Sequence, residues 1–150
     1  MSSNKAICLV AVPVASLALL AAGCGGGKAL TKEEYGSKLS QICKDSNAKL
    51  SGLGLTSQAA FKTKGDQAVQ IGEDTLTEFK ALKAPDEIKD AAKTFTDSAG
   101  QIVQDLKNAN EAAKKDDTGG FTAAVASVQK HAQENDGAAS EMGATECISG

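Results

Sequence analysis

The sequence predicts an all-α protein: a four-helix bundle of up-down-up-down topology with one disulfide bond, preceded by a signal peptide and a glycine-rich tether. Two observations predict the helices. Beyond residue 30, apolar residues recur at spacings of three and four, and no stretch alternates apolar and polar residues as a half-buried β-strand does. The chain has only two prolines, and one of them lies in the leader. Amphipathic helices joined by short connections bury their apolar faces as antiparallel neighbours.

The leader, residues 1–23, has the organisation of an export signal. A short polar start carries Lys5, and an almost wholly apolar run follows over residues 6–20. This run is shorter than the about 20 apolar residues of a spanning helix, and small residues follow it, as at a cleavage site. Residues 20–24 (LAAGC) resemble the lipobox of bacterial lipoproteins, in which the cysteine receives a diacylglyceryl group before cleavage in front of it. The alternative is an ordinary cleaved signal followed by an unrelated cysteine.

The resemblance to the lipobox implies that Cys24 becomes the lipidated first residue of an exported protein. Two or three acyl chains on one cysteine hold a protein on a membrane far more firmly than one chain does. We therefore expect residues 1–23 to be a cleaved signal, 24–30 to be the lipidated cysteine and flexible tether, and 31–150 to be the helical domain. The membrane is the expected partner of Cys24, and the outer face of the plasma membrane is the expected location.

The four cysteines reduce to one pair. Cys8 leaves with the signal peptide and Cys24 carries lipid, so Cys43 and Cys147 remain. Because an exported compartment can be oxidising, we predict a disulfide bond between them. In the chain-entropy model, closing the loop between Cys43 and Cys147 stabilises the fold by about 4–5 kcal/mol. The alternative is two free, buried thiols.

The first helix has the clearest start. Thr31 and Glu34 stand at the two positions of a capping box, and Leu30 and Tyr35 occupy the positions of a hydrophobic staple. Two glycines in the segment 52–54 are expected to end this helix.

The second helix is predicted to begin at Thr56 or Ser57 and to run to about Lys83. Gly65 and Gly72 fall within it, and each costs about 1 kcal/mol relative to alanine. These glycines permit a close approach of a neighbouring helix, or else Gly65 marks a break.

The third helix is predicted to start at Pro85, which suits a first helical position, and to reach about Lys115. A turn over residues 116–120 separates it from the fourth helix. With a helical rise of about 1.5 Å per residue, an unbroken fourth helix would run past the height of Cys43. Because residues 135–137 (NDG) are turn-prone, we expect the fourth helix to end or bend there. The last residues would then double back to bring Cys147 to Cys43.

Composition excludes several functions. The net charge is −3 with charges of both signs interspersed, so a nucleic-acid-binding surface is not expected. All basic residues are lysine, which removes the bidentate guanidinium grip on phosphate or carboxylate.

His131 is the single histidine, and no haem, di-iron or zinc spacing is present, so no cofactor or metal is expected. We expect His131 to be a surface or boundary residue. Without a candidate nucleophile–base pair, an enzyme is not expected either.

The whole layout resembles small secreted lipoproteins of Gram-positive bacteria, especially actinobacteria. Four features carry the resemblance: the LAAGC box, a first helix containing Tyr35 and Ile42-Cys43, the hinge at residues 82–88 (LKAPDEI), and a final cysteine in ATEC, residues 144–147. Such families have no established functional residues, so the resemblance assigns none here.

Three functions remain open at this stage. The first is a non-enzymatic surface protein that binds a protein or an envelope component through a helix face. The second is a carrier of a small molecule or lipid in a cavity between helices, for which Gly65 and Gly72 would leave room. The third is a structural or stress-linked envelope protein without a ligand.

Overall fold

The computed structural model describes residues 30–149, which form four α-helices and two short 3-10 helices. In chain order these are α1 (Lys32–Ser51), α2 (Gln58–Ala81), η1 (Asp86–Ile88), α3 (Lys89–Lys114), α4 (Thr118–Glu141) and η2 (Thr145–Cys147). The described part of the chain contains no β-strand, so the predicted all-α class and the four helices are confirmed. The predicted signal peptide, the lipid site Cys24 and the tether as far as residue 29 lie outside the described residues.

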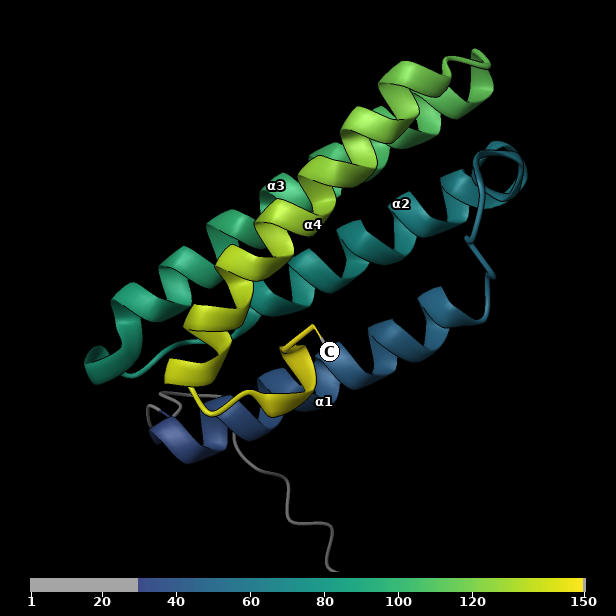
Figure 1. The fold of residues 1–150 in the computed structure, drawn as a ribbon. Helices are drawn as coiled ribbons and strands as arrows, with labels where there is room; N and C mark the ends of the chain where they lie inside the picture. Colours follow the sequence, from purple (N-terminus) through teal and green to yellow (C-terminus); the bar gives the residue numbers. More distant parts are fainter. Residues whose placement is uncertain (1–29, 150) are drawn as a thin grey trace, which may run out of the picture.

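Successive helices run in opposite directions (Figure 1). We call the end where α1 and α3 begin the proximal end, and the opposite end the distal end. The helices α3 and α4 lie against each other, and α2 lies against α3. The helix α1 packs mainly against α2 and against η2, which follows α4. The four helices therefore do not form a symmetric square, because α1 stands apart from the α3–α4 pair.

Local sequence signals place the helix ends. At the start of α1 the Thr31 side chain accepts from the backbone N–H of Glu34 at 3.2 Å. The Glu34 carboxylate accepts the Thr31 N–H at 2.9 Å, which completes the predicted capping box. Ser57 caps α2 in the same way through the N–H of Ala60. Gly54 follows α1 with a φ of +62°, a backbone conformation that glycine adopts without a steric penalty.

The turn between α3 and α4 is shorter than predicted. The helix α4 begins at Thr118, and its two glycines lie in the first helical turn. Asp117 caps the helix by accepting the N–H of Gly120 at 2.9 Å, and Asp116 makes the reversal with a φ of +56°. A tight connection of this kind holds α3 and α4 close together from their first residues onward.

The predicted end of the fourth helix at residues 135–137 is wrong, because α4 continues to Glu141. Tertiary packing overrides the turn tendency of this triplet. Asn135 is buried, its Oδ1 lies 3.2 Å from the Ser98 hydroxyl of α3, and two buried alanines follow at 138 and 139. The chain reverses instead at Gly143, whose φ is +71°. Residues 143–149, which we call the C-terminal strap, then run back to Cys43.

The strap explains how Cys147 reaches Cys43 although α4 does not end at residues 135–137. A Cβ on Gly36 would lie 2.2 Å from the Met142 carbonyl oxygen, so α4 ends beside the first turns of α1. Cys43 stands seven residues further along α1, or about 10 Å at a helical rise of about 1.5 Å per residue. The strap covers this height in the return direction, so the doubling back was predicted correctly and only its starting point was not.

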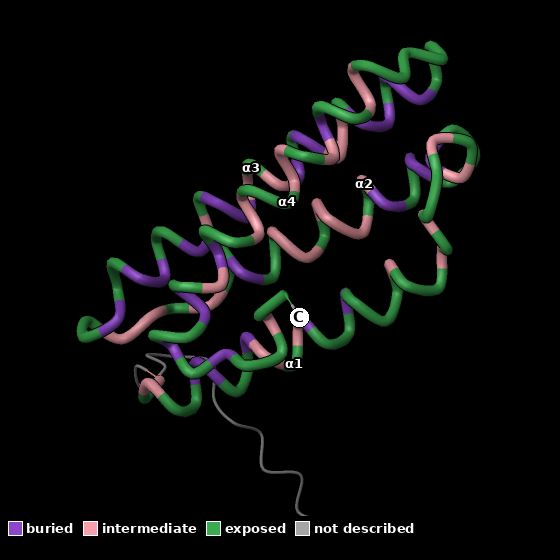
Figure 2. Tube along the Cα trace, in the orientation of Figure 1, coloured by how far each residue is buried: buried purple, intermediate pink, exposed green. Residues whose placement is uncertain are grey.

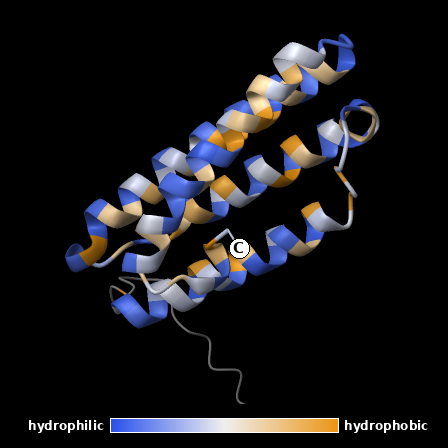
Figure 3. Ribbon diagram, in the orientation of Figure 1, coloured by the Kyte–Doolittle hydropathy of each residue, from blue (hydrophilic) through white to orange (hydrophobic). Residues whose placement is uncertain are grey.

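Two clusters of buried side chains hold the helices together. The larger cluster joins all four helices towards the proximal end and contains Tyr35, Leu39, Phe79, Phe95 and Met142. The smaller cluster lies towards the distal end, where the rings of Phe61 of α2 and Phe121 of α4 meet edge to face with their centroids 5.2 Å apart. Buried positions recur along each helix and are most numerous on α3 (Figure 2). Hydrophobic residues also recur among hydrophilic ones along each helix, as expected of amphipathic helices (Figure 3).

Candidate functional site

A cleft of about 210 Å³ lies where α1 stands apart from α3 and α4. Each of the four helices contributes to its walls, and the C-terminal strap forms part of its rim. The exposed surface of the walls is mostly apolar, and the cleft is open to solvent on one side. The apolar residues of the lining are Cys43, Leu50, Leu76, Phe79, Phe95, Ala99, Ile102, Val103, Leu106, Ala132, Cys147 and Ile148.

Aromatic and branched side chains of α2 and α3 line the inner part of the cleft. Phe79 and Phe95 meet edge to face with their ring centroids 5.0 Å apart, and both are almost fully buried. A pair in this geometry is more stable than its buried area alone implies. Gly72 also lines the cleft, and a Cβ at this position would lie 3.3 Å from Val103 Cγ2. The α2 and α3 parts of the wall are therefore closely packed against each other at Gly72.

The strap is fixed over the cleft by one covalent bond and several hydrogen bonds. Cys43 and Cys147 form the predicted disulfide, with their Cα atoms 5.1 Å apart, within the usual range for a disulfide. Asn47 Nδ2 donates to the Glu146 carbonyl oxygen at 3.3 Å. Beyond the disulfide, the Asp136 carboxylate of α4 accepts both the backbone N–H and the hydroxyl of Ser149, at 2.8 and 2.6 Å. The strap thus bridges α1 and α4, which share few direct contacts.

The polar side chains of the rim mostly bond to one another. The hydroxyl groups of Ser46 and Thr75 lie 2.9 Å apart across the α1–α2 contact. Asn135 bonds to Ser98, and Asn47 bonds to the strap. Apart from Asp136, the lining residues are uncharged. An apolar interior with a few polar groups at its mouth is the usual composition of a small-molecule site.

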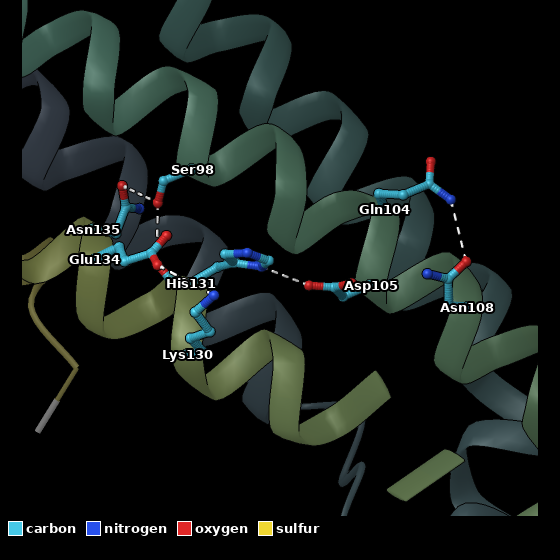
Figure 4. Close-up of polar contacts among 8 residues, drawn as sticks. All are labelled: Ser98, Gln104, Asp105, Asn108, Lys130, His131, Glu134 and Asn135. Carbon is cyan, nitrogen blue, oxygen red and sulfur yellow. Dashed lines mark hydrogen bonds and ion pairs between the residues drawn. The ribbon is translucent and has the colours of Figure 1, made fainter. Parts of the chain in front are cut away.

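A second polar cluster lies between α3 and α4 (Figure 4). His131 Nδ1 lies 2.7 Å from Asp105 Oδ2, and the two side chains are 19 % and 12 % exposed. The Ser98 hydroxyl lies 3.0 Å from the His131 carbonyl oxygen rather than from its ring. Serine, histidine and aspartate therefore occur together without the hydrogen-bond order of a hydrolytic triad, in which the ring must take the serine proton. This cluster joins two helices and supplies no activated nucleophile.

The structure places the residues singled out in the sequence as follows. The disulfide is confirmed, and His131 is a half-buried boundary residue, as predicted, although its pairing with Asp105 was not predicted. Gly65 does not break α2, which is continuous from Gln58 to Ala81. It permits a close helix approach instead, because a Cβ there would lie 2.2 Å from Asn110 Oδ1 of α3.

Sequence reasoning missed Asp136 and the role of Ile148. Asp136 falls inside the triplet that was interpreted as a turn, and nothing in its local pattern indicates a contact with residue 149 thirteen positions away. Ile148 belongs to a segment without helical periodicity. Asp136 reaches the rim because α4 stays helical through this triplet, and the reversal at Gly143 brings Ile148 and Ser149 to it.

Comparison with protein-family models, with curated proteins and with solved structures found no match for this chain. No helix among residues 30–149 is both long and apolar enough to cross a membrane. In the same part of the chain, no group of three or more histidine, cysteine, aspartate or glutamate side chains is arranged to hold a metal ion.

Proposed function

We propose that this protein is a lipid-anchored, extracytoplasmic, non-enzymatic carrier that binds a small apolar molecule or the end of a single acyl chain in the cleft. The anchoring rests on the leader and on Cys24 in the LAAGC box. It is tested by mass spectrometry of the membrane-bound protein, which is expected to begin at Cys24 and to carry a diacylglyceryl group, whereas Cys24→Ser is expected to lose both the lipid and the cleavage. A membrane-bound protein that begins at another residue or carries no lipid would contradict the anchor.

The observation that favours the carrier over a partner-binding helix face is the position of Ile148. It is the one large hydrophobic side chain among residues 30–149 that is classed as exposed, at 40 %, and it lies on the rim of the cleft. A helix face that docks a protein partner normally presents a set of apolar anchors at helical spacing. The described residues offer no such set of exposed large apolar anchors along a helix, and Ile148 lies beside the cleft instead.

The volume of the cleft sets the size of the ligand. A dry apolar cavity of about 150 Å³ accommodates benzene, which has six carbons. By proportion, 210 Å³ accommodates roughly eight carbon atoms. A short alkyl chain or a compact apolar molecule of that size fits, whereas two long acyl chains do not.

A series of straight-chain alcohols from butanol to decanol tests this proposal by calorimetry or by NMR titration of the purified protein. Each buried methylene contributes about 0.8 kcal/mol, so the affinity is expected to rise about fourfold per carbon. The rise is expected to stop at roughly eight carbons, where the cleft is full. Mass spectrometry of an organic extract of the protein from its native membrane would identify a natural ligand.

A matched pair of variants separates binding in the cleft from non-specific adsorption. Ala132 lines the cleft, and Ala132→Leu places three further carbons there and is expected to shorten the optimal chain. Ala126, on the same helix, is exposed and does not line the cleft, so Ala126→Leu is expected to leave the series unchanged. Absence of binding, or an affinity that rises without a plateau and is equal in both variants, would overturn the carrier function. Capture of one specific protein by cross-linking on intact cells, without an extracted ligand, would favour the partner-binding face instead.

A further inference from the structure

Asp136 gives the rim of the cleft an uncompensated negative charge. Among the residues that line the cleft it is the one that carries a formal charge. The described ion pairs involve other acidic residues, and no lysine of residues 30–149 pairs with Asp136. Its two hydrogen bonds come from the neutral backbone and hydroxyl groups of Ser149. The carboxylate is therefore held in place without being neutralised.

This carboxylate also has free acceptor capacity. An ionised carboxylate has about four lone-pair positions, and Ser149 uses two of them. The other polar side chains of the rim also make hydrogen bonds within the protein: Ser46 with Thr75, Asn47 with the strap, and Asn135 with Ser98. A polar group carried by a ligand would thus meet its strongest unsatisfied partner at Asp136.

We propose that the cleft selects a single-chain amphiphile with a cationic amine head, whose alkyl chain lies against Phe79, Phe95 and Ile102 and whose head lies at Asp136. This inference rests on the proposed carrier function and specifies its ligand. A carboxylate head would be repelled by Asp136, and no arginine exists in the chain to hold it. A free amphiphile fits better than a two-chain phospholipid with an amine head, because the volume accommodates roughly eight carbons.

Three ligands with the same chain and different heads test the inference: octylammonium, octanol and octanoate, titrated into the protein at neutral pH and low salt. Asp136 attracts the ammonium head and repels the carboxylate head, and each of these interactions is modest because the site is partly exposed. We therefore expect octylammonium to bind about tenfold more tightly than octanoate. Octanol is expected to fall between them. The tenfold ratio should shrink in high salt, since salt screens exposed charges.

Asp136→Asn keeps the shape of the side chain and an acceptor for Ser149 but removes the charge. It is expected to bring the ratio of octylammonium to octanoate affinity close to one, while the octanol affinity stays within about twofold, which shows that the strap and cleft persist. The control is Asp45→Asn, because Asp45 is exposed, accepts one hydrogen bond from Gln41 and does not line the cleft. This control should keep the tenfold ratio.

The outcomes distinguish the two proposals. Equal binding of all three ligands by the unaltered protein would overturn the head-group selection and leave the carrier function standing. An unchanged ratio in Asp136→Asn, or a ratio insensitive to salt, would also overturn the role of Asp136. If octanol itself does not bind, the carrier function fails first. If Asp136→Asn abolishes octanol binding, salt dependence in the unaltered protein decides the head-group selection.

Discussion

The α3–α4 pair and helix α1 are held in the same fold by different means. Small residues line the α3–α4 contact: Ala109 and Ala113 of α3 cluster with Ala124 of α4, so the two helices approach closely along their length. Helix α1 instead brings larger side chains such as Tyr35 and Leu39 to the core, and the strap with its disulfide ties it covalently to the chain that follows α4. A seam of alanines leaves no space between helices, whereas a helix held at a distance by a covalent bridge leaves a cleft.

The largest effect is expected from removing that bridge. Cys43→Ser with Cys147→Ser opens a loop that spans a sequence separation of 104 residues, for which the chain-entropy model gives about 4–5 kcal/mol. The free energy of unfolding, measured by urea denaturation, should fall by about this amount. Amide hydrogen exchange should accelerate more in α1 than in α3 and α4, because the latter retain their own contact.

The same double variant can also contradict the comparison. If exchange accelerates equally in all four helices, α1 unfolds together with the rest and is not the weaker part of the fold. Reduction of the unaltered protein with a dithiol is the control, and it should reproduce the pattern without any substitution.

A smaller effect is expected at Gly36, where α1 approaches the end of α4 closely. Gly36→Ala places a Cβ 2.2 Å from the Met142 carbonyl oxygen, and backbone atoms cannot turn aside as a flexible side chain can. Such overpacking costs about 1–3 kcal/mol, which exceeds or offsets the gain of about 1 kcal/mol from replacing glycine in a helix. Thermal or urea denaturation should therefore show no increase in the free energy of unfolding.

Gly100 provides the matched control in the α3–α4 pair. It lies within α3, and a Cβ there meets nothing within 4 Å. Gly100→Ala should therefore stabilise the protein by about 0.5–1 kcal/mol through helix propensity alone. Equal stabilisation by both substitutions would show that α1 can move away from the end of α4. It would contradict the expectation that Gly36→Ala is less favourable than Gly100→Ala.

The smallest effect concerns the polar contacts between α2 and α3. Hydrogen bonds from Lys114 and Asn110 hold the pKa of the Asp66 carboxyl below its ordinary value of 3.8. Because the folded-state pKa is the lower one, the stabilisation is present above pH 3.8 and is lost as the pH falls through the folded-state pKa. Lys114→Met should raise the pKa of Asp66 in an NMR titration and change overall stability little, since this pair is exposed. A large loss of stability would show that charge, and not packing, joins α2 to α3.

The helix starts could be predicted from the sequence because caps are local. Thr31 and Glu34 are three residues apart, and their reciprocal hydrogen bonds depend on nothing else in the chain. The disulfide could also be predicted, since assigning Cys8 and Cys24 to the leader and the lipid leaves one pair. These inferences needed neither the distances between helices nor their order in space.

The continuity of α4 and the presence of the cleft could not be predicted, because both depend on contacts between helices that are far apart in the sequence. Asn135 is turn-prone in isolation, and only the Ser98 hydroxyl of another helix and the burial of the following alanines keep it helical. The cleft likewise depends on how far α1 stands from α3, which no periodicity encodes. The hydrogen bonds that hold the Asp136 carboxylate at the rim likewise depend on Ser149, which reaches it only after the chain reverses.

The separation of Cys43 and Cys147 also orders the assembly of the protein. The contacts of α2 with α3 and of α3 with α4 are made by neighbours in the chain, so their loop-closure entropy is small. Joining α1 to the strap instead requires almost the entire domain to be present, since 104 positions separate the two cysteines. High-separation contacts form late in folding. During synthesis from the N-terminus, α1 can therefore pack against α2 early, but the part of α1 that faces η2 stays uncovered until residues 143–149 are made, and only then can the rim of the cleft form.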